Sequence, residues 1–214
     1  LLSSALNQLG ALELDRGELD AAEQTLRRAA ALFVERSDTL RPELAGVLNN
    51  LAVVLASRPD RLEEAAQAYA DALRIVEHNG GSGPRLATLY ANQANVYRLM
   101  GRYDVAETHF DRAMALLTGS LGAEHPATLT AAASLGSMYE VAGRYEDAIQ
   151  VLRGPLALAR SSLPTDHPAT AYIENVLATA LCQRSDPSGF EEGLAAARSS
   201  LASRQASLGP DHWG

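Results

Sequence analysis

Three histidines, each directly preceded by an acidic residue, raise the question of a metal site. They are His125, His167 and His212, which stand 42 and 45 residues apart. The ligands of one zinc ion all lie about 2 Å from it, whereas successive units of a helical repeat are two helix widths apart, at about 8–10 Å for each helix. Histidines at this interval cannot share an ion. We expect them to make loop-capping or inter-repeat hydrogen bonds, and we expect neither a metal nor a cofactor.

The other reactive residue types form no catalytic pattern. The sequence has no nucleophile elbow and no HExxH, and the glycine-rich segment 80–83 lacks the lysine of a P-loop. The paired carboxylates at 63–64 and 191–192 stand at expected helix starts, where they favour the helix dipole. Cys182 is the only cysteine, which excludes an internal disulfide, and we expect it to be half-buried in a helix. We predict that the chain is not an enzyme.

The elements that carry these residues follow a fixed period. Prolines recur every 42 residues, at Pro42, Pro84, Pro126, Pro168 and Pro210. A period of a few tens of residues is typical of a solenoid of stacked units. Proline is tolerated in the first turn of a helix and disfavours helical geometry in the residue before it, so each unit should begin with a helix at its proline. Pro210 keeps the interval only through a three-residue insertion at 184–189, and Trp213 is the true fifth counterpart.

Each unit contains two amphipathic stretches at helical spacing, separated by a turn with glycine or proline. We therefore predict five helix-turn-helix units in one domain, 1–214. Their approximate bounds are 1–40, 41–82, 83–124, 125–166 and 167–211, with a sixth unit beginning at 212–214.

The middle of each first helix carries a small residue, at Gly10, Ala52, Ala94, Gly136 and Ala178. Glycine within a helix costs about 1 kcal/mol relative to alanine. Its repetition indicates a close crossing of the two helices, and we expect alanines of the second helix, such as Ala22 and Ala148, to form the other half of the contact. The turn glycines Gly17, Gly101 and Gly143 should end the first helices in the left-handed conformation.

One spacing recurs in most units: a small residue, then glycine, an aromatic residue or leucine, and alanine, as at Gly136, Gly143, Tyr145 and Ala148. This pattern resembles the tetratricopeptide repeat. The 42-residue period is similar to that of the kinesin-light-chain class of this family. The same class is resembled by two segments, LGAEHPATL at 121–129 and LPTDHPATA at 163–171. HEAT-type helix pairs have a period of about 40–47 residues, but not this signature. The resemblance implies an all-α fold, a right-handed superhelical solenoid of five helical hairpins.

The resemblance also implies that the first helices line a concave face that binds peptides. We expect contacts from Asn7, Asn49, Asn50, Asn92, Asn95, Arg98, Ser137, Glu140, Tyr172 and Asn175. Asparagine offers donors and acceptors to an extended peptide of any sequence. Alternatively, some of these asparagines, Asn50 and Asn92 above all, brace neighbouring helices. Arg98 is the only basic residue that we place on this face, so we expect a ligand with apolar or basic side chains and no clamp for a C-terminal carboxylate.

Composition restricts the partner and the source. The chain of 214 residues is 47% hydrophobic with a formal net charge of −8, which favours a well-packed protein over disorder. Its dispersed basic residues weigh against binding to nucleic acids or anionic membranes, and no apolar run reaches the about 20 residues of a membrane span. All 18 basic residues are arginine, which indicates a GC-rich, bacterial genome. The single cysteine fits a reducing compartment, and we expect the chain in the cytoplasm.

Three hypotheses for function follow. The first is a non-catalytic scaffold that binds a peptide of a partner protein in its concave face. The second is a regulatory or oligomerising module of a larger bacterial signalling enzyme, because LGPDHW at 208–213 resembles repeats that follow bacterial serine/threonine kinases, and similar arrays follow signalling NTPases. Apolar residues at the first helix, such as Leu2, Leu6 and Leu9, indicate further repeats or end-to-end self-association. In the third, the polar face serves only solubility.

Overall fold

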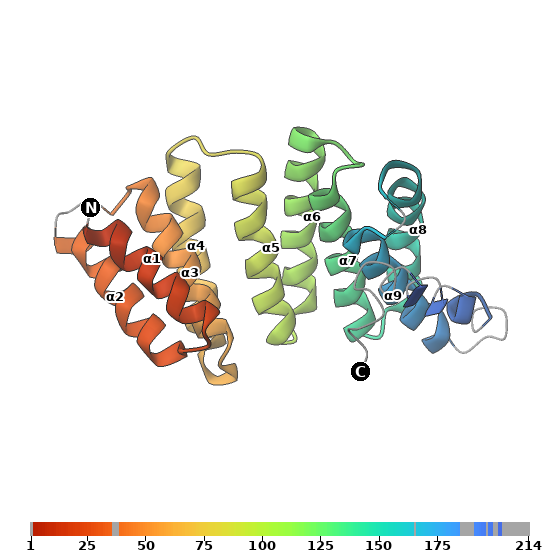
Figure 1. Ribbon diagram of the computed structural model, residues 1–214, viewed down its shortest axis with the longest axis horizontal. Helices are drawn as coiled ribbons and strands as arrows, with labels where there is room; N and C mark the ends of the chain where they lie inside the picture. The colour runs from red at the N-terminus through yellow and green to blue at the C-terminus, as the bar shows by residue number, and fades with distance from the viewer. Residues whose placement is uncertain are drawn as a thin grey trace. The chain divides into compact units, whose positions relative to one another are not determined.

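The computed structural model describes residues 2–35, 39–164, 166–184, 191–195, 197–198 and 201–202, which are helical or irregular and contain no strand. The helices (Figure 1) are α1 (Leu2–Asp15), α2 (Leu19–Glu35), α3 (Pro42–Ala56), α4 (Leu62–His78), α5 (Pro84–Leu99), α6 (Tyr103–Leu121), α7 (Pro126–Val141), α8 (Tyr145–Ser162) and α9 (Pro168–Gln183), with a short 3₁₀ helix, η1 (Pro59–Arg61), before α4. A helical segment at 191–195 follows α9.

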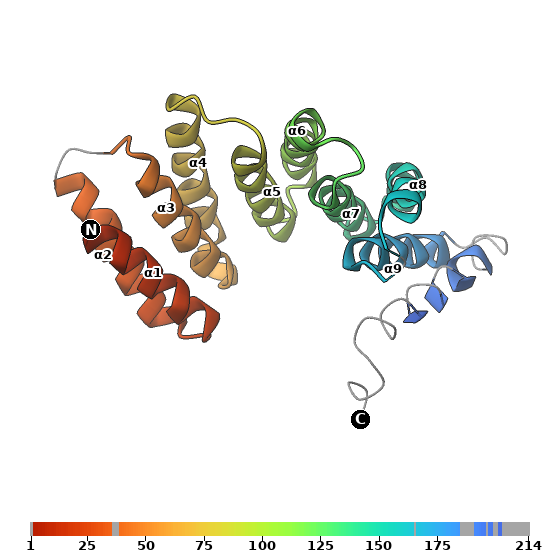
Figure 2. The ribbon, with the colours of Figure 1, turned by 45° about the horizontal axis from the view of Figure 1, so that its top comes forward.

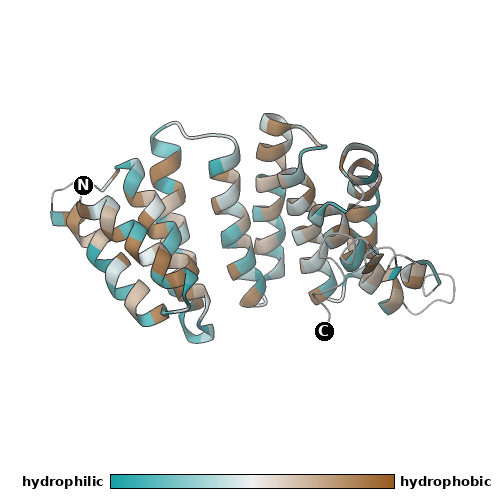
Figure 3. Ribbon diagram, in the orientation of Figure 1, coloured by the Kyte–Doolittle hydropathy of each residue, from teal (hydrophilic) through white to brown (hydrophobic). Residues whose placement is uncertain are grey.

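The chain forms two compact units, Leu1–His109 and Phe110–Gly214. The first unit holds α1 to α5 and the beginning of α6, and the second holds the rest of α6 with α7 to α9. Within the first unit, α1 packs beside α2 and α3 beside α4, and in the second α7 packs beside α8 (Figure 2). Hydrophobic and hydrophilic residues alternate along each helix (Figure 3), as the amphipathic pattern predicts. No described helix has the length and hydropathy to cross a bilayer.

Four of the five periodic prolines begin helices, as predicted. Pro42, Pro84, Pro126 and Pro168 are the first residues of α3, α5, α7 and α9. At this position the missing N–H leaves no intrahelical hydrogen bond unmade. The fifth proline, Pro210, lies outside the described residues, as do Trp213, the true fifth counterpart of Pro168, and the predicted start of a sixth unit.

The turn glycines are also confirmed. Gly101, which ends α5, has φ of 72°, a conformation that costs residues with a Cβ atom far more than glycine. The Gly101 N–H donates to the Arg98 carbonyl at 3.0 Å, and the Arg102 N–H donates to the Tyr97 carbonyl at 2.9 Å. These two bonds satisfy carbonyls at the helix end and turn the chain toward α6. Gly17 and Gly143 adopt the same conformation, with φ of 75° and 73°.

The helices of a hairpin cross closely at the predicted small residues. A Cβ atom on Gly136 would lie 2.8 Å from Leu152, and the buried residue Ala52 occupies the equivalent position of α3. The three nearest atoms belong to Leu152, one turn after the fully buried Ala148 on α8, so Leu152 adds to the partner that we expected. In the fifth unit, a Cβ atom on Gly193 would lie 2.9 Å from the Ala178 carbonyl oxygen, so this crossing is equally close.

Ion pairs join the first two hairpins at their second helices. Glu23 on α2, whose side chain is 13% exposed, accepts hydrogen bonds from Arg27 at 2.9 Å, Arg58 at 2.9 Å and Arg61 at 3.2 Å. Arg61 also pairs with Glu64 at the start of α4. Arg58 directly precedes the 3₁₀ turn that replaces a turn glycine in the second unit, and Arg61 is the last residue of that turn. This network therefore fixes the turn of one hairpin to the helix of the other.

Candidate functional site

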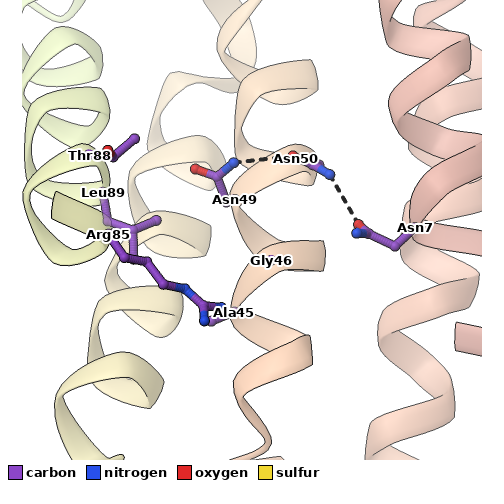
Figure 4. Close-up of a pocket in the computed structure, with 8 residues that line it drawn as sticks. All are labelled: Asn7, Ala45, Gly46, Asn49, Asn50, Arg85, Thr88 and Leu89. Carbon is purple, nitrogen blue, oxygen red and sulfur yellow. Dashed lines mark hydrogen bonds between the residues drawn. The ribbon is translucent and has the colours of Figure 1, made fainter. Parts of the chain in front are cut away.

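Four asparagine side chains form a continuous hydrogen-bonded chain across α1, α3 and α5, which we call the amide ladder. Asn92 Nδ2 on α5 donates to Asn49 Oδ1 on α3 at 3.3 Å. Asn49 Nδ2 donates to Asn50 Oδ1 at 3.1 Å, and Asn50 Nδ2 donates to Asn7 Oδ1 on α1 at 3.1 Å (Figure 4). All three bonds run in the same direction, toward α1. The ladder therefore joins the first helices of three successive hairpins.

A cavity of about 260 Å³ opens beside the amide ladder. We call it the arginine cavity, and its polar lining comes from Asn7, Asn49, Asn50, Arg85 and Thr88. Arg85 reaches from α5 toward Ala45 on α3 (Figure 4) and donates from Nη2 to the Pro42 carbonyl at 2.9 Å. Leu89 and Ala45 supply an apolar part of the wall. The cavity thus combines one cation with several amide groups.

Gly46 forms part of the wall of this cavity. It lies within α3 and lines the arginine cavity, and a Cβ atom built on it would have no atom within 4 Å. At Gly10, by contrast, a Cβ atom would collide with Leu26. Close helix packing therefore explains the glycine at position 10 and does not explain the one at position 46.

A second cavity of about 250 Å³ lies further along the same two helices. We call it the apolar cavity, because Val53 and Ala56 of α3 and Val96 and Leu99 of α5 line it. Asn92, the first member of the amide ladder, is also part of its wall. The two cavities therefore follow one another along the face that α3 and α5 share.

The sequence itself matches a known family over most of its length. The family model described as Tetratricopeptide repeat matches residues 1–78 and 85–153. The chain belongs to the tetratricopeptide repeat family. No curated protein matches the sequence.

Several solved structures share its fold. The nearly identical TPR-like repeats of a kinesin-light-chain candidate from Podosopora anserina superpose with a TM-score of 0.81 at 18% identity, covering 95% of each chain. BtubC (BKLC) from P. vanneervenii gives 0.79 at 21% identity, covering 97% of this chain and 83% of its own. MamA gives 0.62 at 15% identity, covering 92% of this chain and 95% of its own. The fold is an all-α tetratricopeptide repeat array of five hairpins, similar to kinesin-light-chain-like structures.

Most predicted contact residues of the first unit lie together on this face. Asn7, Asn49 and Asn50 line the arginine cavity, and Asn92 lines the apolar cavity. Asn50 and Asn92 also bridge neighbouring helices, as the alternative hypothesis held. The same side chains therefore bridge helices and line a cavity, and their contact with a ligand stays a prediction.

Asn95 and Arg98 form a smaller pair on the same helix. Asn95 lines the apolar cavity and donates to the Ala91 carbonyl at 3.2 Å. Arg98 Nε donates to Asn95 Oδ1 at 3.4 Å. Both side chains are partly buried, so this pair lies at the edge of the apolar cavity and outside the amide ladder.

The remaining predicted contacts belong to the second unit and line neither cavity. Ser137 and Glu140 lie on α7 and are partly buried, and burial raises the pKa of the Glu140 carboxyl. Tyr172 on α9 is partly buried, and Asn175 is exposed. Their role as ligand contacts stays a prediction.

Two expectations about single residues were wrong. Arg98 is not the only cation near this face, since Arg85 lines the arginine cavity. The missed signal is spacing: positions 85, 88, 89 and 92 lie on one stripe of α5, so Arg85 shares the side of the helix that carries Asn92. Cys182 is exposed and not half-buried.

The histidines cap helices, as predicted. His125 Nδ1 accepts the Ala127 N–H at 3.1 Å at the start of α7, and His167 Nδ1 accepts the Ala169 N–H at 3.1 Å at the start of α9. An acceptor at this position satisfies one of the free N–H groups of the first helical turn. His212 lies outside the described residues.

Proposed function

We propose that this chain is a non-catalytic interaction module that binds a peptide segment of a partner protein along the face of α1, α3 and α5. Tetratricopeptide repeats are generally protein–protein interaction modules, which supports a protein partner. The observation that carries the proposal is the amide ladder, which lines a cavity with groups suited to main-chain recognition. We also propose, for the second unit by itself, that the contacts predicted on α7 and α9 bind a peptide segment.

The ladder amides keep hydrogen-bonding capacity for a ligand. Each side-chain amide has two N–H donors and an oxygen with two lone pairs, and the ladder uses one N–H each of Asn49 and Asn50. Their second N–H groups can donate to carbonyls of an extended peptide. Since the ladder already holds the side chains in place, binding costs little additional side-chain entropy.

A selection from a random peptide library displayed on phage tests this proposal, with the chain as the immobilised target. The affinity of the best peptide is then measured by fluorescence anisotropy. We expect the triple substitution Asn49→Ala, Asn92→Ala and Asn95→Ala to weaken binding at least tenfold. The control is Gln24→Ala with Gln67→Ala, on the second helices α2 and α4, which should leave the affinity unchanged. Circular dichroism shows whether each variant is folded.

Two outcomes would contradict the proposal. Failure to select any peptide that binds the folded chain removes the peptide-binding function. Equal affinity of a folded triple variant and the unmodified chain removes the assignment to this face. The second unit is tested in the same way with Ser137→Ala and Asn175→Ala.

One observation favours an oligomerising role as a second candidate. The α1 residues Leu2, Leu9 and Leu12 are exposed. Their counterparts 42 residues later on α3 are buried: Leu44, Leu51 and Val54. The exposed face of α1 is therefore as apolar as the equivalent face of α3, which is buried. Light scattering after size exclusion tests this role, because Leu9→Asp with Leu12→Asp should abolish any dimer, and a chain that is monomeric at high concentration contradicts it.

A further inference from the structure

We propose that the face of α3 and α5 recognises two side chains of the bound peptide, one acidic and one apolar, separated by three positions. The acidic side chain enters the arginine cavity and the apolar side chain enters the apolar cavity. This inference rests on the proposed function and adds the sequence preference of its ligand.

The donors of the arginine cavity suit an anionic acceptor. Because every bond of the amide ladder points toward α1, Asn7 Nδ2 is its last donor, and it has no acceptor among the described residues. Arg85 lines the same cavity and uses Nη2 for the Pro42 carbonyl, which leaves Nε and Nη1 for a ligand. A carboxylate in this cavity can accept from Arg85 or from Asn7, and its bond to the guanidinium is charge-assisted.

Among the described residues, no carboxylate pairs with Arg85. Glu43 is the one acidic residue that lines an adjoining cavity of about 230 Å³, which Asn7 and Arg85 also line. No ion pair joins Glu43 and Arg85 in the described part of the chain, although its ion pairs include several between exposed residues. Arg85 therefore remains available to a carboxylate from the ligand. A basic ligand side chain, one of the two kinds that we expected from the sequence, would be unfavourable in this cavity because Arg85 would repel it.

Gly46 gives the acidic side chain access to these donors. It lines both cavities that Asn7 and Arg85 share. Glycine is a poor helix former, and the space around its missing Cβ atom is open. A larger residue at this position would project from α3 between the donor of α1 and the donor of α5. The glycine is thus explained by the space that a ligand group needs.

The apolar cavity suits an aliphatic or aromatic side chain. Leu99 is 52% exposed, and it shares the cavity wall with Val53, Ala56 and Val96. A ligand side chain in this cavity would remove apolar surface of both molecules from water, which is the main favourable contribution to most protein association. The exposed leucine is therefore accounted for by the same ligand.

The spacing of the cavities sets the spacing of the two side chains. Gly46 and Val53 on α3 are seven residues apart, as are Leu89 and Val96 on α5. At about 1.5 Å per residue, seven helical residues span roughly 10 Å. A polyproline-II peptide rises about 3.1 Å per residue with three residues per turn. Residues i and i+3 then lie on one side, about 9 Å apart, whereas in a β-strand they point to opposite faces.

The amide ladder lies between the two anchors. Asn49 belongs to the arginine cavity and Asn92 to the apolar cavity, and the 3.3 Å hydrogen bond between them crosses from α3 to α5. The peptide backbone between the acidic and apolar residues passes over this bond. There the free N–H of Asn49 can donate to a peptide carbonyl, which polyproline-II geometry leaves unpaired.

Fixed-spacing libraries of nonapeptides test the inference. Each library carries one Glu and one Leu separated by one to six positions, in either order, with the other positions random. We expect the strongest enrichment at a separation of three. In the best peptide, Glu→Gln should weaken binding about tenfold and Glu→Lys further. Arg85→Ala should abolish the preference for Glu over Gln, and Arg74→Ala, an exposed arginine on α4, should not.

Gly46→Leu provides an independent test because it fills the arginine cavity without removing a donor. We expect it to weaken binding at least tenfold, whereas Gly154→Leu, at an exposed and equally open helical glycine of α8, leaves the affinity unchanged. Binding peptides without a preference for Glu, or without a preferred separation, overturn this inference and leave the proposed function intact. Absence of binders from every library, random or fixed, overturns both.

Discussion

A Cβ atom at position 10 would lie 2.6 Å from Leu26 Cγ, the branch point of a fully buried side chain. Because Leu26 cannot move away by rotating its end alone, Gly10→Ala must shift α1 relative to α2. We expect this substitution to lower the free energy of unfolding by about 1–3 kcal/mol, even though alanine favours the helix. Urea denaturation followed by circular dichroism measures the change.

Gly119→Ala is the matched control for this prediction. Gly119 also lies within a helix, α6, but a Cβ atom there would meet nothing within 4 Å. Only helix propensity should act, and it should raise the free energy of unfolding by about 0.5–1 kcal/mol. Substitutions with effects of the same sign at both positions would contradict the packing explanation.

The amide ladder should couple neighbouring hairpins energetically. Asn50 on α3 donates to Asn7 on α1 at 3.1 Å, and a hydrogen bond of this kind contributes about 0.5–1.5 kcal/mol. In a double-mutant cycle with Asn7→Ala and Asn50→Ala, we expect an interaction energy of about 0.5–1 kcal/mol from urea denaturation. The same cycle with Asn7→Ala and Asn175→Ala, whose side chains lie in different units, should give additive effects. Additivity in the first cycle would show that the ladder contributes nothing to the stability of the array.

Helix boundaries were predictable because the chemistry that sets them is local. Pro84 begins α5 through its own ring, and Gly101 ends α5 through its own backbone freedom. Neither effect depends on a distant part of the chain. Repetition of these residues at one interval then identified the hairpins, and the family match agrees with that identification.

The cavities were less predictable because they depend on the direction of side chains across hairpins. Asn49 and Asn50 are neighbours in the sequence, yet Asn49 accepts from α5 and Asn50 donates to α1. The spacing of residues in the sequence placed both asparagines on the first helix of their hairpin. It did not indicate that one would bond to the preceding hairpin and the other to the following one. Gln93 shows a further limit: it is 2% exposed, at the position that Leu51 occupies one unit earlier, and donates to the Ala66 carbonyl at 2.9 Å. The repeat pattern of the sequence does not indicate this backbone partner.

His125 should stabilise α7 through its cap. Its Nδ1 accepts the Ala127 N–H, and loss of a side-chain cap typically costs about 0.5–2 kcal/mol. We expect His125→Ala to lower the free energy of unfolding by about 1 kcal/mol, and His125→Asn to restore most of it because asparagine is a good cap. Urea denaturation measures both. Equal stability of the Ala and Asn variants would contradict a capping role.

Glu23 should make the stability of the first unit depend on pH. Partial burial alone would raise the pKa of Glu23, but the hydrogen bond from Arg27 and the charges of Arg61 and Arg27 hold it below the ordinary 4.5. The folded state therefore favours the carboxylate. Its stabilising contribution is fully present above pH 4.5 and is lost as the pH falls through the lower pKa of the folded state. Glu64 should contribute to the pH dependence in the same direction, because the hydrogen bond from Arg61 lowers its pKa to about 2.

Glu23→Gln tests this dependence because it removes the charge and keeps the shape. At pH 7 we expect the free energy of unfolding of the variant to be about 1.5–3 kcal/mol lower, the range for hydrogen bonds to charged groups. The difference from the unmodified chain should shrink as the pH is lowered below 4.5. Asp71→Asn, which removes an exposed ion pair with Arg74 within α4, should change the free energy by less than about 0.5 kcal/mol. A Glu23→Gln effect that is the same at pH 7 and below pH 4 would show that the arginines do not stabilise the charged carboxylate.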